Sequence, residues 1–69
     1  MSIRKYSVAI RGHRTSFSLE PEFFAEIKRL SAEQKTTVSD LIARIDSERT
    51  GNLSSALRLY VLNAVKKNV

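Results

Sequence analysis

The chain has 69 residues, with 12 Lys and Arg against 7 Asp and Glu, so its formal net charge is +5. This length allows one domain, 1–69, whose small core would gain from oligomerisation, and the lack of Cys excludes disulfides and thiolate metal sites. Hydrophobic residues make up 42% of the sequence, too many for a disordered chain, and there is no low-complexity tract or evident internal repeat.

Positive charge is concentrated at the N-terminus. Residues 1–19 contain no acid, whereas residues 20–69 are close to neutral. The basic residues of the first segment are Arg4, Lys5, Arg11 and Arg14. A basic segment on a near-neutral body favours a polyanionic partner, most simply nucleic acid, over a merely solubilising tail.

Residues 1–13 are either a basic arm or a hairpin strand. Apolar side chains occupy even positions from Tyr6 to Ile10 and odd positions from Phe17 onward, so a turn or bulge must separate the two runs. A turn about Gly12-His13 is the candidate. It would pair Ile10 with Thr15, Val8 with Phe17 and Tyr6 with Leu19.

Residues 14–19 alternate polar and apolar side chains, as a strand with one buried face does, and Glu20-Pro21 follows as a helix start. A lone strand would leave its backbone groups unpaired. The simplest remedy is the same strand from a second copy, which makes a two-stranded ribbon across a two-fold axis. Such a ribbon can enter the major groove of DNA.

Three helices follow. The first is expected at 21–34, where Phe23, Ile27 and Leu30 recur at helical spacing. The second, at 38–49, begins with a capping sequence at Thr37 and stops before Gly51. The third, at 53–67, is capped by Asn52.

The third helix has a wider apolar sector than one buried face requires. In so small a chain this width indicates burial against another subunit, either the second copy of a homodimer or an adjacent dimer in a tetramer. The predicted oligomer-interface residues are Leu53, Leu57, Leu59, Tyr60, Val61 and Leu62.

The order strand, helix, turn, helix resembles the ribbon-helix-helix DNA-binding family, to which the Arc and MetJ repressors belong. The match rests on Arg14-Thr15-Ser16-Phe17-Ser18-Leu19-Glu20 and on Thr37-Val38-Ser39-Asp40-Leu41-Ile42. Gly12-His13-Arg14-Thr15-Ser16 and Asn52-Leu53-Ser54-Ser55-Ala56-Leu57 look like a small bacterial subgroup with an added third helix. The turn between the first two helices departs from the family, having Lys35 and Thr36 where Gly and an apolar residue are usual.

The resemblance implies a mainly α fold with an N-terminal β-strand, which forms an intertwined homodimer plus the third helix. It implies a cytoplasmic, nucleoid-associated regulator, a repressor, that reads double-stranded DNA with the outer side of its ribbon. The base-reading residues would be Arg14, Ser16 and Ser18. The dimer core would contain Phe17, Leu19, Phe23, Ile27, Leu30, Leu41, Ile42 and Ile45.

Phosphate contacts are expected at two places. The N-terminus of the second helix offers unpaired backbone N–H groups and the positive end of the helix dipole. The residues there are Lys35, Thr37, Val38 and Ser39. The basic residues Arg4, Lys5 and Arg11 would contact the backbone elsewhere.

Other functions were weighed against a DNA-binding regulator. In an antitoxin the same module would bind DNA while the third helix bound a toxin, although such wrapping segments are often polar and disordered until bound. A protein-interaction module and an architectural DNA-binding protein are the remaining alternatives. We expect no enzyme, cofactor or metal, because nothing pairs a nucleophile with a base and His13, the only histidine, reads as a turn residue. No apolar run is long enough for a signal peptide or membrane span, so we expect no membrane partner.

Overall fold

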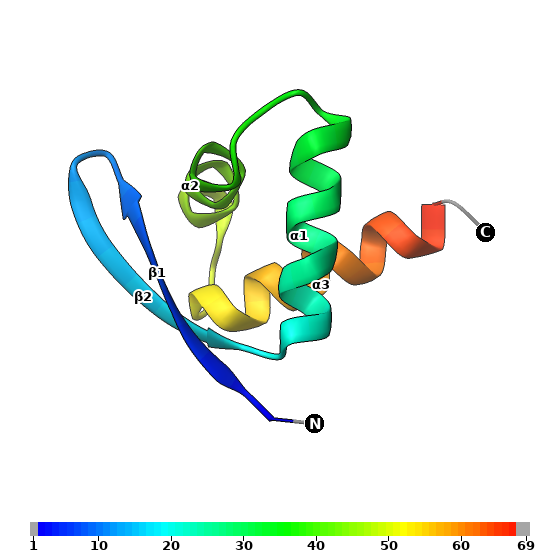
Figure 1. The fold of residues 1–69 in the computed structure, drawn as a ribbon, viewed down its shortest axis with the longest axis horizontal. Helices are drawn as coiled ribbons and strands as arrows, with labels where there is room; N and C mark the ends of the chain where they lie inside the picture. The colour runs from blue at the N-terminus through cyan, green and yellow to red at the C-terminus, as the bar shows by residue number, and fades with distance from the viewer. Residues whose placement is uncertain (1, 68–69) are drawn as a thin grey trace.

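The computed structural model describes residues 2–67 as a β-hairpin followed by three helices. In chain order the elements are β1 (Arg4–Ile10), β2 (His13–Leu19), α1 (Pro21–Glu33), α2 (Val38–Glu48) and α3 (Leu53–Lys67). The hairpin lies along one side of the molecule and the helices pack together on the other (Figure 1). The predicted fold class, mainly helical with an N-terminal ribbon and a third helix, is confirmed.

The ribbon forms within one chain. β1 and β2 make a two-stranded antiparallel sheet, so the hairpin alternative for the N-terminal segment is confirmed. The sequence favoured the same strand of a second copy as the partner of β2. In the structure, β1 of the same chain pairs with β2 over all seven residues. The backbone groups along this edge of β2 are therefore satisfied inside the chain.

The hairpin turn lies one residue earlier than predicted. Its central residues are Arg11 and Gly12, whose φ angles are 52° and 80°. Positive φ at both central residues defines a type I′ turn, whose twist matches that of the flanking strands.

The predicted strand pairing is accordingly wrong by two residues. The structure pairs Ile10 with His13, Val8 with Thr15 and Tyr6 with Phe17. The predicted pairing would have set Arg11 directly opposite Arg14, where like charges repel. It is Ala9 that lies opposite Arg14. Because a shift of two residues preserves the alternation of side chains, the predicted faces of the hairpin are unchanged.

The three helices begin at the predicted residues, and α1 and α2 end one residue earlier than predicted. α1 closes with Lys35 in the left-handed region, at φ 56°. The N–H of Lys35 donates to the carbonyl of Ala32 at 3.1 Å, and that of Thr36 donates to the carbonyl of Ser31 at 2.9 Å. This is a Schellman ending, in which the left-handed position usually holds Gly. Asn52 accepts from the N–H of Ser55 at 2.8 Å and so caps α3 as expected.

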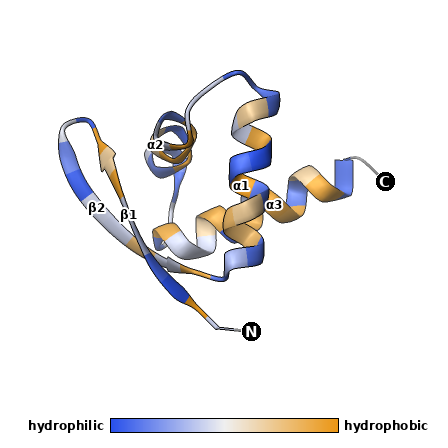
Figure 2. Cartoon of the chain, in the orientation of Figure 1, coloured by the Kyte–Doolittle hydropathy of each residue, from blue (hydrophilic) through white to orange (hydrophobic). Residues whose placement is uncertain are grey.

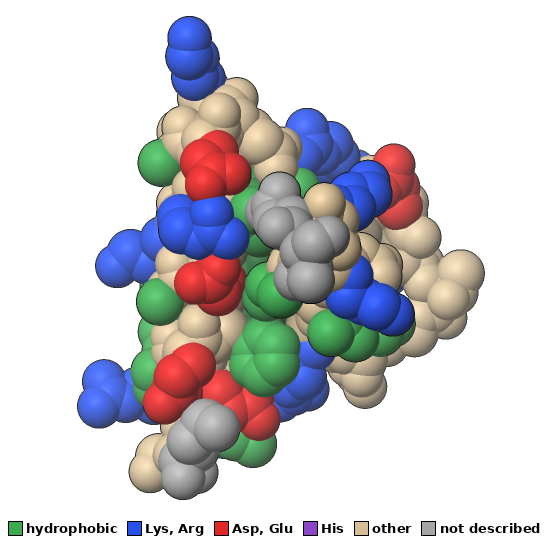
Figure 3. All heavy atoms as spheres, turned by 90° about the vertical axis from the view of Figure 1, so that its right-hand side faces the viewer, with side chains coloured by type: hydrophobic (Ala, Val, Ile, Leu, Met, Phe, Trp, Pro, Cys, Tyr) green, Lys and Arg blue, Asp and Glu red, His purple; other side chains and the backbone are tan. Residues whose placement is uncertain are grey.

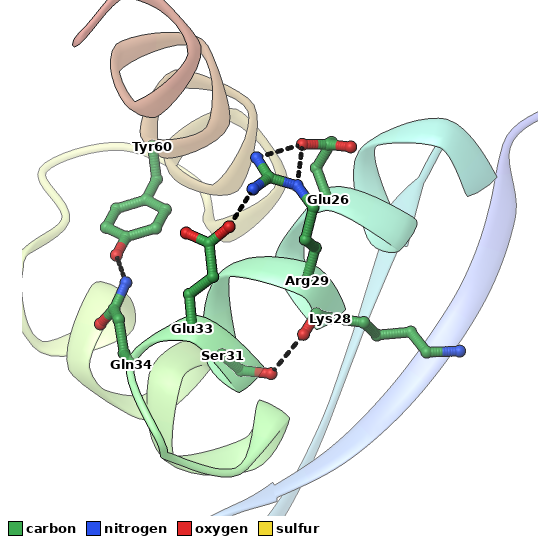
Figure 4. A network of polar contacts seen from close by, with 7 residues as sticks. All are labelled: Glu26, Lys28, Arg29, Ser31, Glu33, Gln34 and Tyr60. Carbon is green, nitrogen blue, oxygen red and sulfur yellow. Dashed lines mark hydrogen bonds and ion pairs between the residues drawn. The ribbon is translucent and has the colours of Figure 1, made fainter. Parts of the chain in front are cut away.

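All five elements contribute to one core. Its buried members are Ile10, Phe17, Leu19, Ile27, Leu30, Leu41, Ile42, Ile45, Leu53, Leu57 and Val61. Seven of the eight predicted dimer-core residues are thus buried within a single chain, and Phe23 is half-buried. The only buried polar residue among those described is Ser31, whose hydroxyl donates to the carbonyl of Lys28 at 2.8 Å (Figure 4).

An aromatic cluster holds the hairpin against α1. The ring of Tyr6 on β1 stacks on Phe24 of α1 with centroids 4.0 Å apart, and on Phe17 of β2 with centroids 5.7 Å apart. Such pairs contribute about 0.5–1.5 kcal/mol beyond the burial of their area. The inner face of the hairpin is therefore fixed to the helices, and its outer face points away from them.

Candidate nucleic-acid interface

The outer face of the hairpin carries six exposed side chains, three from each strand. They are Lys5, Ser7 and Ala9 of β1 and Arg14, Ser16 and Ser18 of β2. Side chains two apart on a strand are separated by about 6.6 Å. The outer face of the hairpin is therefore two parallel rows of small or basic side chains, with every large apolar group of the strands turned inward.

Charge on this face is unopposed. Arg14 and Lys5 make no ion pair within the described residues, and residues 2–19 contain no acid. Arg29 on α1 is the contrast, because it lies between Glu26 and Glu33 and binds both (Figure 4). Figure 3 shows acidic side chains interspersed with basic ones on the side of the molecule that turns away from the hairpin. The basic side chains of the hairpin are thus free for an external anion.

The predicted phosphate-contacting residues of the hairpin lie at its two ends. Arg11 is exposed in the turn, whereas Arg4 and Lys5 are exposed at the start of β1. Six residues of strand separate these two groups by about 20 Å. They would therefore contact the DNA backbone at two well-separated points.

The start of α2 leaves two backbone donors free of intrahelical bonds. Thr37 caps the helix, its Oγ1 accepting from the N–H of Asp40 at 3.0 Å. This bond does not use the N–H groups of Val38 and Ser39, and no intrahelical partner exists for the first donors of a helix. Lys35, exposed in the preceding turn, adds a positive charge close to this end in sequence. α2 itself packs against β1 of the hairpin.

Two polar contacts connect the hairpin to α3. The hydroxyl of Ser54 donates to the carbonyl of Ser18 at 2.6 Å. The Nε of Arg58 donates to Glu20 at 2.9 Å, and this bond lowers the pKa of the Glu20 carboxyl from its ordinary 4.5. The C-terminal end of β2 is thereby held against the first turns of α3.

The predicted oligomer-interface residues divide into two groups. Leu53, Leu57 and Val61 belong to the core of the chain, while Tyr60 is half-buried and accepts a hydrogen bond from Gln34 at 2.6 Å (Figure 4). The other two point outward: Leu59 is 58% exposed and Leu62 is 49% exposed. Together with Val65, which is 43% exposed, they form the outward face of α3. Hydrophobic residues accordingly run along most of this helix (Figure 2).

Comparison with protein families identifies the domain. A model described as a ribbon-helix-helix domain matches residues 3–65, which is nearly the whole chain. The chain belongs to the ribbon-helix-helix family. Ribbon-helix-helix domains are regulatory DNA-binding modules rather than enzymes. No curated protein and no solved structure matches the chain.

Among residues 2–67, no group of three or more His, Cys, Asp or Glu side chains is arranged to hold a metal ion. No helix in the same part of the chain has the length and apolar character needed to cross a membrane.

The contribution of Ser7 and Ala9 to the outer face depends on the hairpin, which the sequence left as one of two alternatives. The sequence signal for this placement was the alternation of apolar residues over 6–10, because it already put these two side chains on the polar side of a strand.

Proposed function

We propose that the chain is a homodimeric transcriptional repressor that binds double-stranded DNA in a sequence-specific manner through the major groove. The observation that carries the proposal is the outer face of the hairpin, an exposed two-stranded ribbon with basic ends and no acid. The major groove accepts a two-stranded ribbon, and base edges there are distinguished by hydrogen bonding.

Arg14 is the principal reader in this proposal. Its guanidinium can donate two hydrogen bonds to the O6 and N7 atoms of guanine. The hydroxyls of Ser16 and Ser18 can form hydrogen bonds with several different bases, so they are less selective. Arg4, Lys5, Arg11 and Lys35 would bind phosphates and supply affinity that depends on salt. Each phosphate neutralised adds about 0.9 to the log–log slope of affinity against salt concentration.

The start of α2 would hold a phosphate through its backbone. Val38 and Ser39 offer N–H groups at the positive end of the helix dipole, and the half-buried Ser39 also has a hydroxyl donor. Thr37 caps this end by accepting from the N–H of Asp40, and its own O–H stays available to donate to the same phosphate.

The homodimer is proposed to form through the outward face of α3. Leu59, Leu62 and Val65 expose apolar area that association would remove from water. Members of this family typically bind DNA as dimers, and two-fold symmetry would match two half-sites on the duplex. A dimer bound across a promoter would exclude polymerase, which gives repression.

Selection from a pool of random duplexes, followed by fluorescence anisotropy at about 150 mM salt, tests the proposal. The selected duplex is expected to bind at least ~10³-fold more tightly than a shuffled one. Arg14→Ala should remove most of that preference. Lys66→Ala is the control, because it removes the same charge from an exposed position at the far end of α3 and should preserve the preference. Equal binding of selected and shuffled duplexes by the wild type would contradict the proposal.

A further inference from the structure

The first acid of the chain lies at the end of the basic hairpin. Residues 2–19 contain no acid, and Glu20 follows β2 directly as the N-cap residue of α1, with its backbone still extended. Because alternate residues of a strand share a side, Glu20 lies in line with Ser16 and Ser18. A free carboxylate at this position would repel the phosphates of a bound duplex.

Arg58 of α3 neutralises this acid. Its Nε donates to Oε1 of Glu20 at 2.9 Å. Both side chains are largely covered, Arg58 being 32% and Glu20 20% exposed. The other three ion pairs of the described residues join positions three or four apart in sequence. The pair of Arg58 and Glu20 therefore differs from them, because it exists only when α3 packs against the end of β2.

A second bond from α3 holds the backbone beside this acid. The hydroxyl of Ser54 donates to the carbonyl of Ser18 at 2.6 Å. The two-residue turn closes with the hydrogen-bonded pair Ile10 and His13, and such pairs alternate with non-bonded ones along an antiparallel sheet. Counting from the turn, Ser18 belongs to a non-bonded pair, so its carbonyl points away from β1. Ser54 thus supplies a donor that β1 cannot.

The two contacts lie one helical turn apart on α3. Ser54 and Arg58 are four residues apart, so their side chains share one face of the helix. Leu53 and Leu57 of the same turns are buried in the core. Figure 1 shows the start of α3 beside the end of β2. The end of the reading row is therefore held by side chains that project from a fixed part of the fold.

We propose that α3 is a positioning element of the DNA interface, in which Ser54 fixes the backbone of Ser18 and Arg58 neutralises the carboxylate of Glu20. This inference rests on the proposed DNA-binding function. Neither Ser54 nor Arg58 touches DNA in this arrangement. Ser54 contributes to discrimination between sequences, because base contacts require a fixed backbone. Arg58 contributes to affinity for any duplex, because phosphate repulsion does not depend on sequence.

Substitution of Ser54 tests the first role. Ser54→Ala is expected to lower affinity for the selected duplex about fivefold and to leave affinity for the shuffled duplex unchanged, because only base contacts are misplaced. Ser54→Thr keeps the hydroxyl and should retain the preference. Ser55→Ala is the matched control, since Ser55 is exposed and only its backbone N–H is bonded, to Asn52. Equal effects of Ser54→Ala and Ser55→Ala, or equal losses on both duplexes, would overturn this role of Ser54.

Substitution of Arg58 tests the second role. Arg58→Gln leaves the charge of Glu20 unopposed and is expected to weaken binding to both duplexes about threefold at 150 mM salt, and more at lower salt. Adding Glu20→Gln should restore affinity without restoring the bond. Adding Glu22→Gln instead removes an equal charge from an exposed residue of α1 and should not. An unchanged affinity in Arg58→Gln, or recovery that is the same in both double variants, would overturn this role of Arg58.

The wild type separates this inference from the proposed function. A wild type that prefers the selected duplex, with Ser54→Ala and Arg58→Gln both binding as it does, would overturn the inference and leave the proposed function intact. A wild type that prefers no duplex would overturn the proposed function and this inference together.

Discussion

Two surfaces of this small domain are exposed for different physical reasons. The outer face of the hairpin is polar and basic, so water solvates it in the free protein and a polyanion can replace that water. The outward face of α3 is apolar, with Leu59 58% exposed, and it gains stability only when another apolar surface covers it. The contrast is consistent with the proposal that the first surface meets DNA and the second meets protein.

The two surfaces are also separated in space. The hairpin forms one side of the molecule, and α3 starts beside it and passes behind α1 toward the opposite side (Figure 1). A dimer formed through α3 would therefore keep both hairpins free. Substitutions on one surface should leave the function of the other unchanged, and the following predictions use this independence.

The largest loss of DNA affinity is expected from removing the three polar side chains of β2 on the outer face of the hairpin. Replacing Arg14, Ser16 and Ser18 together with Ala should weaken binding to the selected duplex by about 10²–10⁴-fold, because a bidentate base contact contributes about 1–3 kcal/mol and a dimer loses it twice. Sedimentation velocity should show an unchanged dimer. Wild-type affinity in this variant would show that the ribbon does not read DNA.

A smaller effect is expected from the outward face of α3. Leu59→Gln combined with Leu62→Gln should give monomers in sedimentation velocity without changing the melting temperature of the protomer. Affinity for a duplex with two half-sites should fall by about 10²-fold, because the dimer no longer holds the second hairpin close to its half-site once the first has bound. Ser55→Gln, an exposed change on the same helix, is the control. Persistence of the dimer would contradict an interface at α3.

Substitutions of Lys35, in the turn between α1 and α2, should change the free energy of unfolding and the DNA affinity in opposite directions. Lys35 holds φ at 56°, a conformation that costs a non-glycine residue about 1 kcal/mol. Lys35→Gly should therefore raise the free energy of unfolding by up to about 1 kcal/mol and lower DNA affinity several-fold. Lys35→Asn removes the same charge and tolerates the left-handed region, so its affinity should fall to a similar extent. Equal affinity of all three proteins would exclude a phosphate contact at Lys35.

The smallest effect concerns the link between the hairpin and α3. Because Arg58 lowers the pKa of Glu20, this pair stabilises the fold fully above the carboxyl's ordinary value of 4.5. Its contribution is lost as the pH falls through the lowered pKa of the folded state. In urea titrations, Glu20→Gln should be less stable than wild type at pH 7, and the difference should shrink as the pH falls below 4.5 and through the lowered pKa. A difference that does not change with pH would mean that the charge of Glu20 is not involved.

Periodicity predicted the helices because each one buries a single stripe. Leu41, Ile42 and Ile45 recur at helical spacing in a run that begins at a capping Thr37, so α2 could be assigned from local signals. The same alternation that placed Phe17 and Leu19 inside the hairpin also gave its outer side. These elements depend on residues close together in the chain, which is why the sequence was sufficient.

The strand pairing of the hairpin could not be predicted from local sequence rules alone, because it depends on which two residues form the turn. Gly12 indicated where the turn lies. The other left-handed residue of the turn is Arg11, and arginine rarely adopts this conformation. Repulsion between Arg11 and Arg14 and stacking of Tyr6 on Phe24 favour the observed pairing, and the stacking involves a residue from a different element. In α3, helical spacing already placed Leu59 on a different side from Leu57, and the packed structure shows that Leu57 lies inside the chain while Leu59 lies outside.

The most direct test of the central claim is titration of the ¹⁵N-labelled protein with the selected duplex, followed by NMR. The account predicts that the largest amide shift changes fall within 5–9 and 14–18, with further changes at Val38 and Ser39. The amides of α3 around Leu62 should change little. Shift changes concentrated on α3, with the hairpin unaffected, would contradict the claim that the hairpin is the DNA-reading surface.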